Sequence, residues 1–439
     1  MVAATIYAPA TAPGRAPVGV MRVSGPAAAN VAELLTGRPV PPPRQAALRR
    51  LRDPGSGEPF DEALLLWFPA PRSETGEDLL EIQHHGGSAV LAALLAALAV
   101  VPGCRPAGPG EFTRRAFLRG KLDLTAAEGL ADLIDATSRA QARQALRQLG
   151  GELGRLYRGW RERLLEALAR VEAEIDFAAE EEVPEAMLAA VRPDLDRLRA
   201  ELRAHLADGR RGERLRSGIT VAVTGPPNVG KSSLVNLLAG RDVAIVTPLP
   251  GTTRDVIEVQ LELAGLPVML LDTAGLRDTT DPIEAEGVAR ARQRAVAADL
   301  RLVMGEVGAP PAGEGDPDAI PVVNKIDCEP AVRLPAGAVA ISCRTGAGIP
   351  ELLELLAARA VDLAGAGDAP LITRARHRHA VAEAAEALDR VAARAEEGAE
   401  LALAAEDLRL AARAIGGIVG AVGVEDVLDR IFATFCIGK

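Results

Sequence analysis

A glycine-rich segment that ends in a lysine and a serine has the residue types and spacing needed to bind phosphate groups. Gly225-Pro-Pro-Asn-Val-Gly-Lys-Ser232 matches the pattern G-x-x-x-x-G-K-[ST], directly after an apolar strand pattern and at the start of a helical one. Such glycines let backbone N–H groups converge on phosphate oxygens, and the helix N-terminus adds a favourable dipole. Lys231 can reach the β- and γ-phosphates, and the Ser232 hydroxyl can bind Mg²⁺.

Two later segments contain residues that suit a magnesium–phosphate site. Asp272-Thr-Ala-Gly275 ends a second apolar strand, where Asp272 can hold the Mg²⁺ shell and the Gly275 N–H can contact the γ-phosphate. Gly251-Thr-Thr-Arg-Asp255 lies between the two motifs, and we assign the second Mg²⁺-ligating hydroxyl to its Thr253.

A fourth motif predicts which base is bound. Asn324-Lys-Ile-Asp327 follows the apolar strand 320–323. The Asp327 carboxylate can accept two hydrogen bonds from guanine N1 and N2, whereas adenine presents an acceptor there, so this residue selects GTP over ATP. Lys325 can lie along the base plane, and the backbone of Ser342-Cys-Arg344 can contact the guanine oxygen. The motifs, in this order, predict a Mg²⁺-dependent GTP-hydrolysing domain.

The residues expected around GTP come from these motifs and from the segment before Thr253. They are Asn228, Val229, Gly230, Lys231, Ser232, Ser233, Thr247, Pro248, Leu249, Pro250, Gly251, Thr252, Thr253, Asp272, Thr273, Ala274, Gly275, Asn324, Lys325, Ile326, Asp327, Ser342, Cys343 and Arg344.

The group that orients the attacking water has to come from an unusual position. Leu276 follows the Asp-Thr-Ala-Gly motif, where Ras-type enzymes have a glutamine, and leucine cannot orient water. Glu284 is the nearest plausible carboxylate besides Asp278 and Asp281, and we predict it as the catalytic residue. The alternative is an exposed acid at a helix start.

The elements around these motifs alternate between strand and helix patterns, which predicts a mostly parallel sheet covered by helices. The predicted strands are 219–224, 256–263, 268–272, 300–304 and 320–324, with helices from Lys231 and near 286–296. This pattern fills residues 217–369. Helical spacing on either side, over 120–216 and 370–439, predicts a discontinuous helical domain into which a Ras-like P-loop domain is inserted.

The first 119 residues have a different pattern. Apolar strand patterns at 18–23, 63–68 and 79–83 alternate with helical ones at 27–35 and 89–101, which predicts an N-terminal α+β domain. The chain is therefore expected to be multi-domain, with α/β and α parts, which suits a length of 439 residues.

Composition limits the function classes. A net charge of -10 argues against a protein that coats nucleic acid by charge alone, so any RNA contact should be local. Four cysteines without a C-x-x-C pair favour neither a disulfide framework nor a zinc site. No secretory signal opens the chain, and the apolar run 89–101 is shorter than the roughly 20 residues needed to span a bilayer, so we expect a cytoplasmic protein without membrane contact.

Several motifs outside the GTP-binding segment carry a family resemblance. They are Gly19-Val-Met-Arg-Val-Ser-Gly25, Thr75-Gly-Glu-Asp78, Pro109-Gly-Glu-Phe-Thr-Arg-Arg-Ala-Phe117, Lys121-Leu-Asp-Leu124, Ala131-Asp-Leu-Ile-Asp135 and Phe435-Cys-Ile-Gly-Lys439. With these motifs the chain resembles the tRNA modification GTPase MnmE (TrmE) family over essentially its whole length.

The resemblance implies an N-terminal domain, similar to folate-binding domains, that forms a homodimer and binds 5-formyl- or 5,10-methylene-tetrahydrofolate. The folate contacts implied are Arg22, Glu81, Lys121 and Lys439. It also implies a heterotetramer with an FAD-dependent partner of the MnmG (GidA) type, which adds an aminomethyl or carboxymethylaminomethyl group at C5 of a wobble uridine in tRNA.

The resemblance further implies a potassium ion beside the phosphates in place of an arginine finger. Its ligands would be Asn228, Thr247, the backbone carbonyl of Leu249, and Thr252, and Glu284 matches the family's water-orienting glutamate. The chain departs from the family at Pro248 and Pro250, where Asp and Ala are common.

Two other functions remain open from the residues alone: a ribosome-assembly or signalling GTPase that acts as a binding switch, and a folate-binding regulator without modification activity. The N-terminal domain discriminates them, because a pure switch needs no folate pocket. The basic runs 114–121, 210–216 and 374–378 either contact tRNA phosphates or form solvated helix faces. Adjacent His84 and His85 would point to opposite faces of a strand, which disfavours a shared metal.

Overall fold

The computed structural model describes residues 4–177, 187–208, 210–241, 258–272, 296–309, 311, 316–328, 334–365, 371–397, 401–422, 425–435 and 438. These residues form two compact units. Unit 1 contains Met1–Ala131 and Gly416–Lys439, and unit 2 contains Asp132–Ile415. Each unit is described by itself below.

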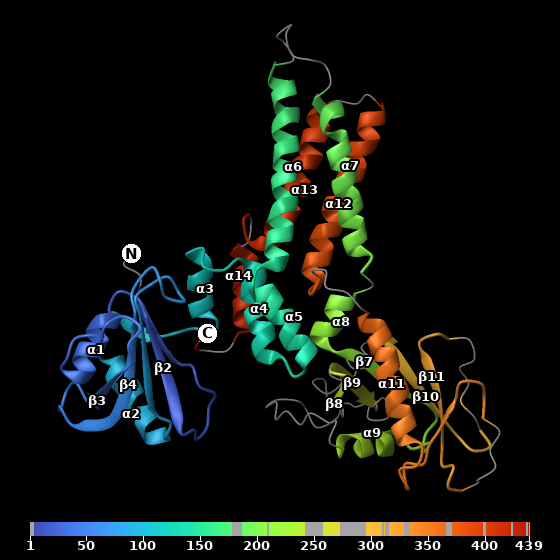
Figure 1. Ribbon diagram of the computed structural model, residues 1–439, viewed down its shortest axis with the longest axis horizontal. Coiled ribbons are helices and arrows are strands. Elements are labelled where there is room, and N and C mark those ends of the chain that lie inside the picture. Colours follow the sequence, from blue (N-terminus) through green and yellow to red (C-terminus); the bar gives the residue numbers. More distant parts are fainter. Residues whose placement is uncertain are drawn as a thin grey trace, which may run out of the picture. The chain divides into compact units, whose positions relative to one another are not determined.

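Unit 1 is built on a six-stranded sheet in the order β3-β4-β5-β2-β1-β6 (Figure 1). The strands are β1 (Thr5–Pro9), β2 (Val18–Ser24), β3 (Ala47–Arg52), β4 (Pro59–Phe68), β5 (Leu79–His85) and β6 (Cys104–Pro106). Neighbouring strands are antiparallel except β1 and β6, which are parallel. The strands predicted near 18–23, 63–68 and 79–83 are confirmed.

One face of this sheet packs on two helices, α1 (Ala28–Thr36) and α2 (Ser88–Ala99), which confirms the helices predicted there. Alternate strand residues such as Met21, Leu65 and Ile82 are fully buried in a core with side chains of both helices. This is the period-2 pattern of a sheet with one face in the core. Residues of the other parity, including Arg22 and Glu81, therefore lie on the opposite face.

The C-terminal segment of the chain packs within unit 1. Helix α14 (Glu425–Ala433) contacts α3 (Glu111–Leu118) and α4 (Leu124–Asp135) through an apolar core in which the Phe117 and Phe432 ring centroids are 6.5 Å apart. Gly438 has φ +99°, and a Cβ atom on it would lie 2.2 Å from the Pro9 carbonyl oxygen. Gly438 is therefore in close contact with the backbone at the end of β1.

Unit 2 contains a second six-stranded sheet, in the order β12-β11-β10-β7-β9-β8. Its strands are β7 (Ile219–Thr224), β8 (Glu258–Leu263), β9 (Leu266–Asp272), β10 (Leu300–Glu306), β11 (Ala319–Asn324) and β12 (Val339–Ala340). All pairs are parallel except the β8–β9 hairpin. The sheet core includes side chains of α9 (Lys231–Ala239) and α11 (Ile349–Ala364), which confirms the predicted parallel architecture.

The remaining helices of unit 2 are α5 (Arg139–Leu149), α6 (Glu152–Phe177), α7 (Met187–Leu206), α8 (Arg211–Ser217), α12 (Ala375–Glu397) and α13 (Leu401–Val419). The long helices α6, α7, α12 and α13 lie side by side as a bundle (Figure 1). Among the described residues, no helix combines the length and apolar character needed to cross a membrane.

One carboxylate binds both segments that connect the bundle to the sheet. Asp132 Oδ1 accepts a hydrogen bond from Arg216 Nε at 2.8 Å and another from Arg374 Nη2 at 2.8 Å. Arg216 lies just before β7, and Arg374 lies just before α12. The chain therefore enters the sheet and returns to the helices beside the same side chain.

Candidate functional site

The phosphate-binding loop lies between the end of β7 at Thr224 and the start of α9 at Lys231. Its first and last glycines have positive φ angles and no room for a side chain. A Cβ on Gly225 would lie 2.3 Å from the Met304 carbonyl oxygen, and a Cβ on Gly230 would lie 2.4 Å from Asn324 Nδ2. Glycine is required at both positions because the backbone is in the left-handed region and because neighbouring atoms occupy the space.

Lys231 lies over this loop. Its side chain is largely buried, and its Nζ donates hydrogen bonds to the carbonyl oxygens of Gly225 and Pro226, both at 2.8 Å. A buried ammonium needs such partners. The same position places the charge where phosphate oxygens bind in loops of this type.

The base-reading motif is joined to the phosphate-binding loop by a buried amide. Asn324, at the end of β11, donates a hydrogen bond from Nδ2 to the Val229 carbonyl at 2.8 Å, and its Oδ1 accepts one from the Cys343 N–H at 3.1 Å. Because Asn324 is 3% exposed, both bonds are shielded from water. The structure thus brings together three of the motifs predicted from the sequence.

Asp327 lies next to the final predicted motif. Its Oδ1 accepts a hydrogen bond from the Ser342 hydroxyl at 2.6 Å, and its Oδ2 forms an ion pair with Arg344 at 2.7 Å. The Ser342 hydrogen bond is the main reason why the pKa of Asp327 is lowered, with a smaller contribution from the Arg344 charge. The carboxylate is therefore held in its ionised form, as an acceptor for base N–H groups.

One residue near this motif was missed by the sequence analysis. Glu306 ends β10, and its carboxylate forms an ion pair with Lys325. An acid at the end of a parallel strand beside a nucleotide motif was the available signal.

The oxygen donors suited to Mg²⁺ lie at the same edge of the sheet. Asp272 is buried at the end of β9, and Ser232 and Ser233 belong to the first turn of α9. Asn228, the one predicted potassium ligand that the structure describes, has φ +62° in the phosphate-binding loop. Carboxylate and hydroxyl oxygens are the donors that Mg²⁺ prefers.

Other predicted site residues lie outside the described residues. These are Thr247, Pro248, Leu249, Pro250, Gly251, Thr252, Thr253, Thr273, Ala274, Gly275, Glu284 and Lys439. Leu276 and most of the helix expected near 286–296 lie outside them as well.

The predicted folate residues lie on the open face of the unit 1 sheet and beside it. Arg22 and Glu81 are directly opposite in the β2–β5 register, and Arg22 Nε lies 3.0 Å from Glu81 Oε1. Arg22 also forms an ion pair with Glu74 at 2.9 Å, a partner that the sequence analysis missed. Lys121 follows α3 and has an exposed side chain.

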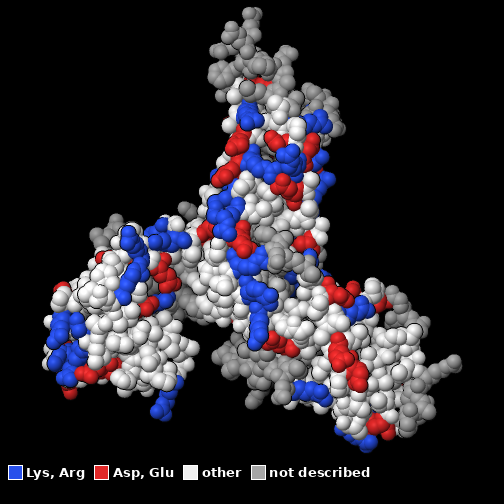
Figure 2. Space-filling view, in the orientation of Figure 1, with Lys and Arg blue, Asp and Glu red and all other residues white. Residues whose placement is uncertain are grey.

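Many arginines of the three basic runs form ion pairs within their own unit. Arg115 binds Glu77, Arg214 binds Asp299 at 2.7 Å, and Arg378 binds both Asp208 and Glu213. Figure 2 shows Lys and Arg interleaved with Asp and Glu along the helical part, instead of gathered into one patch. Structural ion pairs thus account for much of the basic character of these runs.

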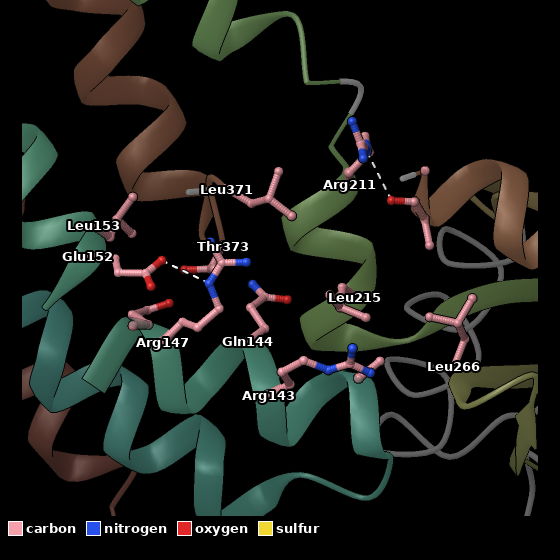
Figure 3. Close-up of a pocket in the computed structure, with 14 residues that line it drawn as sticks. Arg143, Gln144, Arg147, Glu152, Leu153, Arg211, Leu215, Leu266, Leu371 and Thr373 are labelled. Atoms are coloured by element: carbon pink, nitrogen blue, oxygen red, sulfur yellow. Dashed lines mark hydrogen bonds and ion pairs between the residues drawn. The ribbon is translucent and has the colours of Figure 1, made fainter. Parts of the chain in front are cut away.

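A cavity of about 220 Å³ lies among α5, α8 and the segment before α12 (Figure 3). Two of its arginines have partners in the cavity wall, since Arg147 Nε lies 2.8 Å from Glu152 and Arg211 Nε donates to the Ala364 carbonyl at 2.9 Å. None of the predicted nucleotide residues lines it. We interpret it as part of the junction between the helices and the sheet.

His84 and His85 point to opposite faces, as predicted. His84 is buried, whereas the His85 side chain is exposed and pairs with Asp61 at 2.6 Å. No group of three or more His, Cys, Asp or Glu side chains suited to a metal ion occurs among the described residues.

Comparison with known proteins identifies the family. Residues 5–121 match the family model described as GTP-binding protein TrmE N-terminus, and residues 124–436 match the MnmE helical domain. The tRNA modification GTPase MnmE of Parvibaculum lavamentivorans is 55% identical over 439 residues, which cover 99% of this chain and 100% of that protein. The Rhodospirillum rubrum protein of the same name is 52% identical, with 100% of both chains covered. The human mitochondrial 5-taurinomethyluridine-[tRNA] synthase subunit GTPB3 is 48% identical over 99% of this chain and 93% of its own length. With two matched domain models and relatives that align along its whole length, the chain belongs to the MnmE family of tRNA modification GTPases.

Proposed function

We propose that this chain is the GTP-hydrolysing component of a complex that modifies C5 of a wobble uridine in tRNA with an aminomethyl or carboxymethylaminomethyl group. Family membership supports the tRNA reaction, and the names of the bacterial and human relatives agree with it. The observation that carries the GTP assignment is the buried Asn324 side chain, which joins the phosphate-binding loop to the loop that holds Asp327.

In the proposed nucleotide site, backbone N–H groups of the phosphate-binding loop and the Lys231 ammonium bind the phosphates. Ser232 and Thr253 ligate Mg²⁺, and Asp272 holds its water shell. Asp327 accepts hydrogen bonds from guanine, and the ionised state favoured by its lowered pKa suits this role. The remaining contacts are those predicted from the sequence.

For hydrolysis we propose that Asn228, Thr247, Leu249 and Thr252 hold K⁺, which supplies positive charge near the β- and γ-phosphates when bound. Glu284 then orients the attacking water. Both roles fit Leu276, which leaves the usual water-orienting position without a polar group.

In unit 1 we propose a site for a formyl- or methylene-tetrahydrofolate, which would supply the carbon that is transferred. Lys121 and Lys439 would pair with glutamate carboxylates of the folate tail, and Glu81 would accept hydrogen bonds from the pterin ring. Two observations fit this group: the Lys121 side chain is exposed, and Glu81 is oriented by Arg22 at 3.0 Å.

The proposed domain boundaries are 1–119 for the folate-binding-like and dimerisation domain, 120–216 and 370–439 for the helical domain, and 217–369 for the GTPase domain. We propose a cytoplasmic homodimer that joins an FAD-dependent MnmG (GidA) type partner in a heterotetramer and acts on tRNA. The observed grouping of α14 with α3 adds a direct link between the chain's C-terminal helix and the N-terminal domain.

The proposal is tested by mass spectrometry of wobble nucleosides from a strain that lacks the gene. Loss of the C5 modification is expected, with recovery on expression of the intact chain but not of Lys231→Ala, because this variant lacks the phosphate-binding cation. Glu354→Gln, on the exposed side of α11, is the matched control and should restore modification fully. Normal modification in the deleted strain would contradict the proposal.

A further inference from the structure

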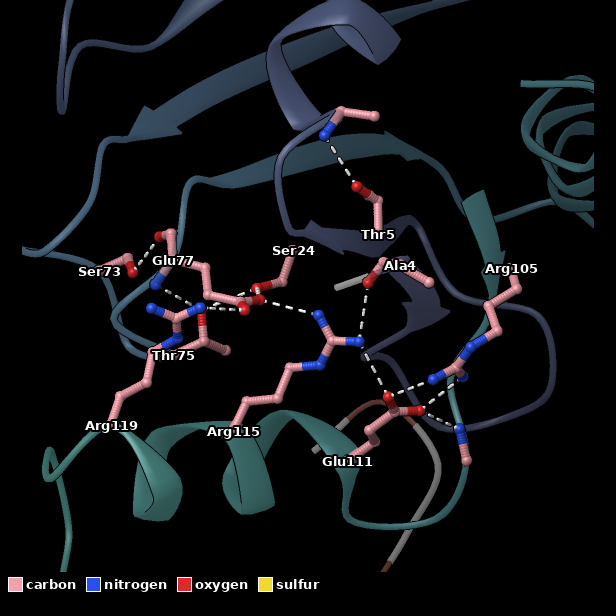
Figure 4. Close-up of polar contacts among 12 residues, drawn as sticks. Ala4, Thr5, Ser24, Ser73, Thr75, Glu77, Arg105, Glu111, Arg115 and Arg119 are labelled. Atoms are coloured by element: carbon pink, nitrogen blue, oxygen red, sulfur yellow. Dashed lines mark hydrogen bonds and ion pairs between the residues drawn. The ribbon is translucent and has the colours of Figure 1, made fainter. Parts of the chain in front are cut away.

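A buried carboxylate in unit 1 connects a strand, a loop and a helix (Figure 4). Glu77 Oε2 accepts hydrogen bonds from the Ser24 hydroxyl at 3.1 Å and from Arg115 Nη1 at 2.8 Å, and its Oε1 accepts one from Arg119 Nη2 at 2.8 Å. The Glu77 side chain is only 6% exposed. Arg115 of α3 and Arg119, directly after that helix, therefore bind one acid that belongs to the loop before β5.

The partners of Glu77 are themselves held in place. Ser24 and Thr75 are fully buried, and their hydroxyl oxygens lie 2.7 Å apart. Arg115 also donates to the Ala4 carbonyl at 2.8 Å and to Glu111 at 3.0 Å. Hydrogen bonds that share buried partners strengthen one another and fix one arrangement of the elements.

The loop that contains Glu77 contacts both sides of the proposed folate site. Glu74 forms the 2.9 Å ion pair with Arg22. Gly76 has φ +74°, and a Cβ on it would lie 3.1 Å from Arg119 Cδ and 3.4 Å from Lys121 Cε. The stems of Arg119 and Lys121 thus pack directly over Gly76, one residue from the buried carboxylate.

Lys121 is placed by the same helix that Glu77 binds. Lys121 lies two residues after Arg119, and its backbone N–H donates a hydrogen bond to the Ala116 carbonyl of α3 at 2.9 Å. Its own ammonium makes no ion pair in the described part of the chain. The backbone of Lys121 is therefore fixed while its charge remains available to a ligand.

The charge balance around Glu77 favours its ionised form. Burial would raise the pKa of Glu77, but hydrogen bonds from Arg115 and Arg119 and the charge of Arg115 outweigh burial and lower the pKa. A neutral amide at this position would leave Arg115 with Glu111 as its one carboxylate partner, and Arg119 with none among the described residues. Removing one partner of a buried charge pair is costly, so α3 should shift or loosen at its C-terminal end.

We propose that Glu77 is a positioning residue that sets the place of the Lys121 ammonium relative to Arg22 and Glu81, and thereby the preference for ligands with a carboxylate tail. This inference rests on the proposed folate site. Glu77 itself touches no ligand in this arrangement. Its effect passes through Arg119 and the C-terminal turn of α3 to Lys121.

A double-mutant cycle tests the coupling between Glu77 and Lys121. Calorimetry on the full chain would measure the affinity for 5-formyltetrahydrofolate and for an analogue that lacks the glutamate tail, with wild type, Glu77→Gln, Lys121→Met and the double variant. Each single variant should weaken binding of the tailed ligand about tenfold, since a charge-assisted hydrogen bond is lost. The double variant should bind no more than about twofold more weakly than Lys121→Met alone.

The tail-free analogue separates positioning from a general structural defect. All four proteins should bind it with similar affinity, because it offers no carboxylate to Lys121. Equal weakening for both ligands, or additive losses in the cycle, would overturn the inference while leaving the folate site intact. Absence of any binding by the wild-type chain would instead contradict the proposed folate site, and the inference with it.

A second variant decides the matter if Glu77→Gln fails to fold. Arg119→Gln changes the half-exposed partner of the same carboxylate and should give the same selective loss for the tailed ligand. Arg105→Gln is the matched control, because Arg105 pairs with Glu111 at 2.6 Å and has no contact with Glu77. If Arg105→Gln weakens binding as much as Arg119→Gln does, any disturbance of the ion-pair cluster weakens ligand binding. That result would contradict the proposed role of Glu77.

Discussion

Asn324 donates a hydrogen bond from its Nδ2 to the carbonyl oxygen of Val229 at 2.8 Å, with both groups shielded from water. Val229 belongs to the phosphate-binding loop, whereas Asn324 begins the base-reading motif. The two halves of the proposed nucleotide site are therefore linked in this structure through one amide. A substitution of Asn324 should consequently weaken binding of the phosphates as well as of the base.

Asn324→Ala removes this bond and the one from the Cys343 N–H. We expect GTP affinity to fall about tenfold to a hundredfold, because the buried Val229 carbonyl and the half-buried Cys343 N–H lose their partner. Fluorescence titration with a labelled GTP measures this loss. Asp318→Asn, at an exposed position beside the same strand, is the control. An Asn324→Ala affinity within twofold of wild type would show that the link does not support binding.

Asp327→Asn should weaken GTP binding at least about tenfold and relax base selectivity, because the amide presents a donor to a donor on guanine. Affinities for GTP and for xanthosine triphosphate should move in opposite directions. Competition binding with both nucleotides gives the ratio directly. If the ratio is the same as in the wild type, Asp327 does not read the base.

Replacing K⁺ by Na⁺ should cut GTP hydrolysis at least about tenfold, since a cation in the role of an arginine finger contributes about 10³ to 10⁵ in rate. Phosphate release at saturating GTP and Mg²⁺ measures this rate. Equal rates in the two salts would contradict the proposed role of K⁺, and Pro248 and Pro250 would then be the first positions to test for a changed mechanism.

Glu284→Ala should slow turnover strongly with little change in GTP affinity, because a water-orienting group acts mainly in the transition state. Phosphate release under the same conditions measures this loss.

Acidification should destabilise the helical bundle through His205. This ring packs against Trp160, with centroids 5.2 Å apart, and its Nε2 lies 3.2 Å from the Tyr157 hydroxyl. Burial is the main cause that lowers the pKa of His205 from 6.5 to about 4, with help from the charges of His377 and Arg378 and against that of Asp208.

The unfolded chain therefore binds the proton more readily, and stability falls as the pH drops from about 6.5 to about 4, by up to about 3 kcal/mol. Urea unfolding followed by Trp160 fluorescence, in a Trp67→Phe background, measures this loss. His205→Phe should flatten the pH dependence in that window, whereas His379→Phe, at an exposed position, should leave it unchanged. Parallel pH curves for wild type and His205→Phe would disprove the assignment.

Deleting residues 436–439 should abolish tRNA modification while sparing GTP hydrolysis. Gly438 lies against the Pro9 carbonyl in unit 1, far along the chain from the nucleotide motifs, and we predict that Lys439 pairs with a folate carboxylate. Lys439→Gln separates the charge from the backbone contact and should weaken binding of the tailed folate. Full modification by the truncated chain would eliminate the predicted role of the C-terminus.

The elements around the phosphate-binding motif were predictable because their signals are local. The phosphate-binding motif, the strand before it and the helix after it occupy one continuous segment, and β7 has the bounds predicted from its apolar run. Strands with weaker signals were missed. Strand β3 reads Ala-Leu-Arg-Arg-Leu-Arg and has no alternation of apolar and polar residues, because its two leucines point to opposite faces: Leu51 is buried and Leu48 is exposed.

Contacts between distant segments were not predictable. Glu77 is 38 residues from Arg115 and 42 from Arg119, and neither spacing is a helical or strand period. The runs 210–216 and 374–378 read as possible RNA-binding surfaces for the same reason, because their acidic partners lie elsewhere in the chain. Periodicity identifies the elements, whereas the pairing of buried charges depends on how those elements meet.

Asp132 holds together the two ends of the GTP-binding segment. Its carboxylate binds Arg216 and Arg374, 84 and 242 residues further along, so the two ends of the insertion are fastened at one point. In polymer terms the insertion is a closed loop, and the entropy of closing a loop grows only with the logarithm of its length. An insertion of another size whose ends lie equally close would therefore add little to the folding cost. The Asp132 carboxylate thus holds both ends of the GTP-binding segment against the helices, together with the Arg214–Asp299 ion pair and the hydrogen bond from Arg211 to the Ala364 carbonyl.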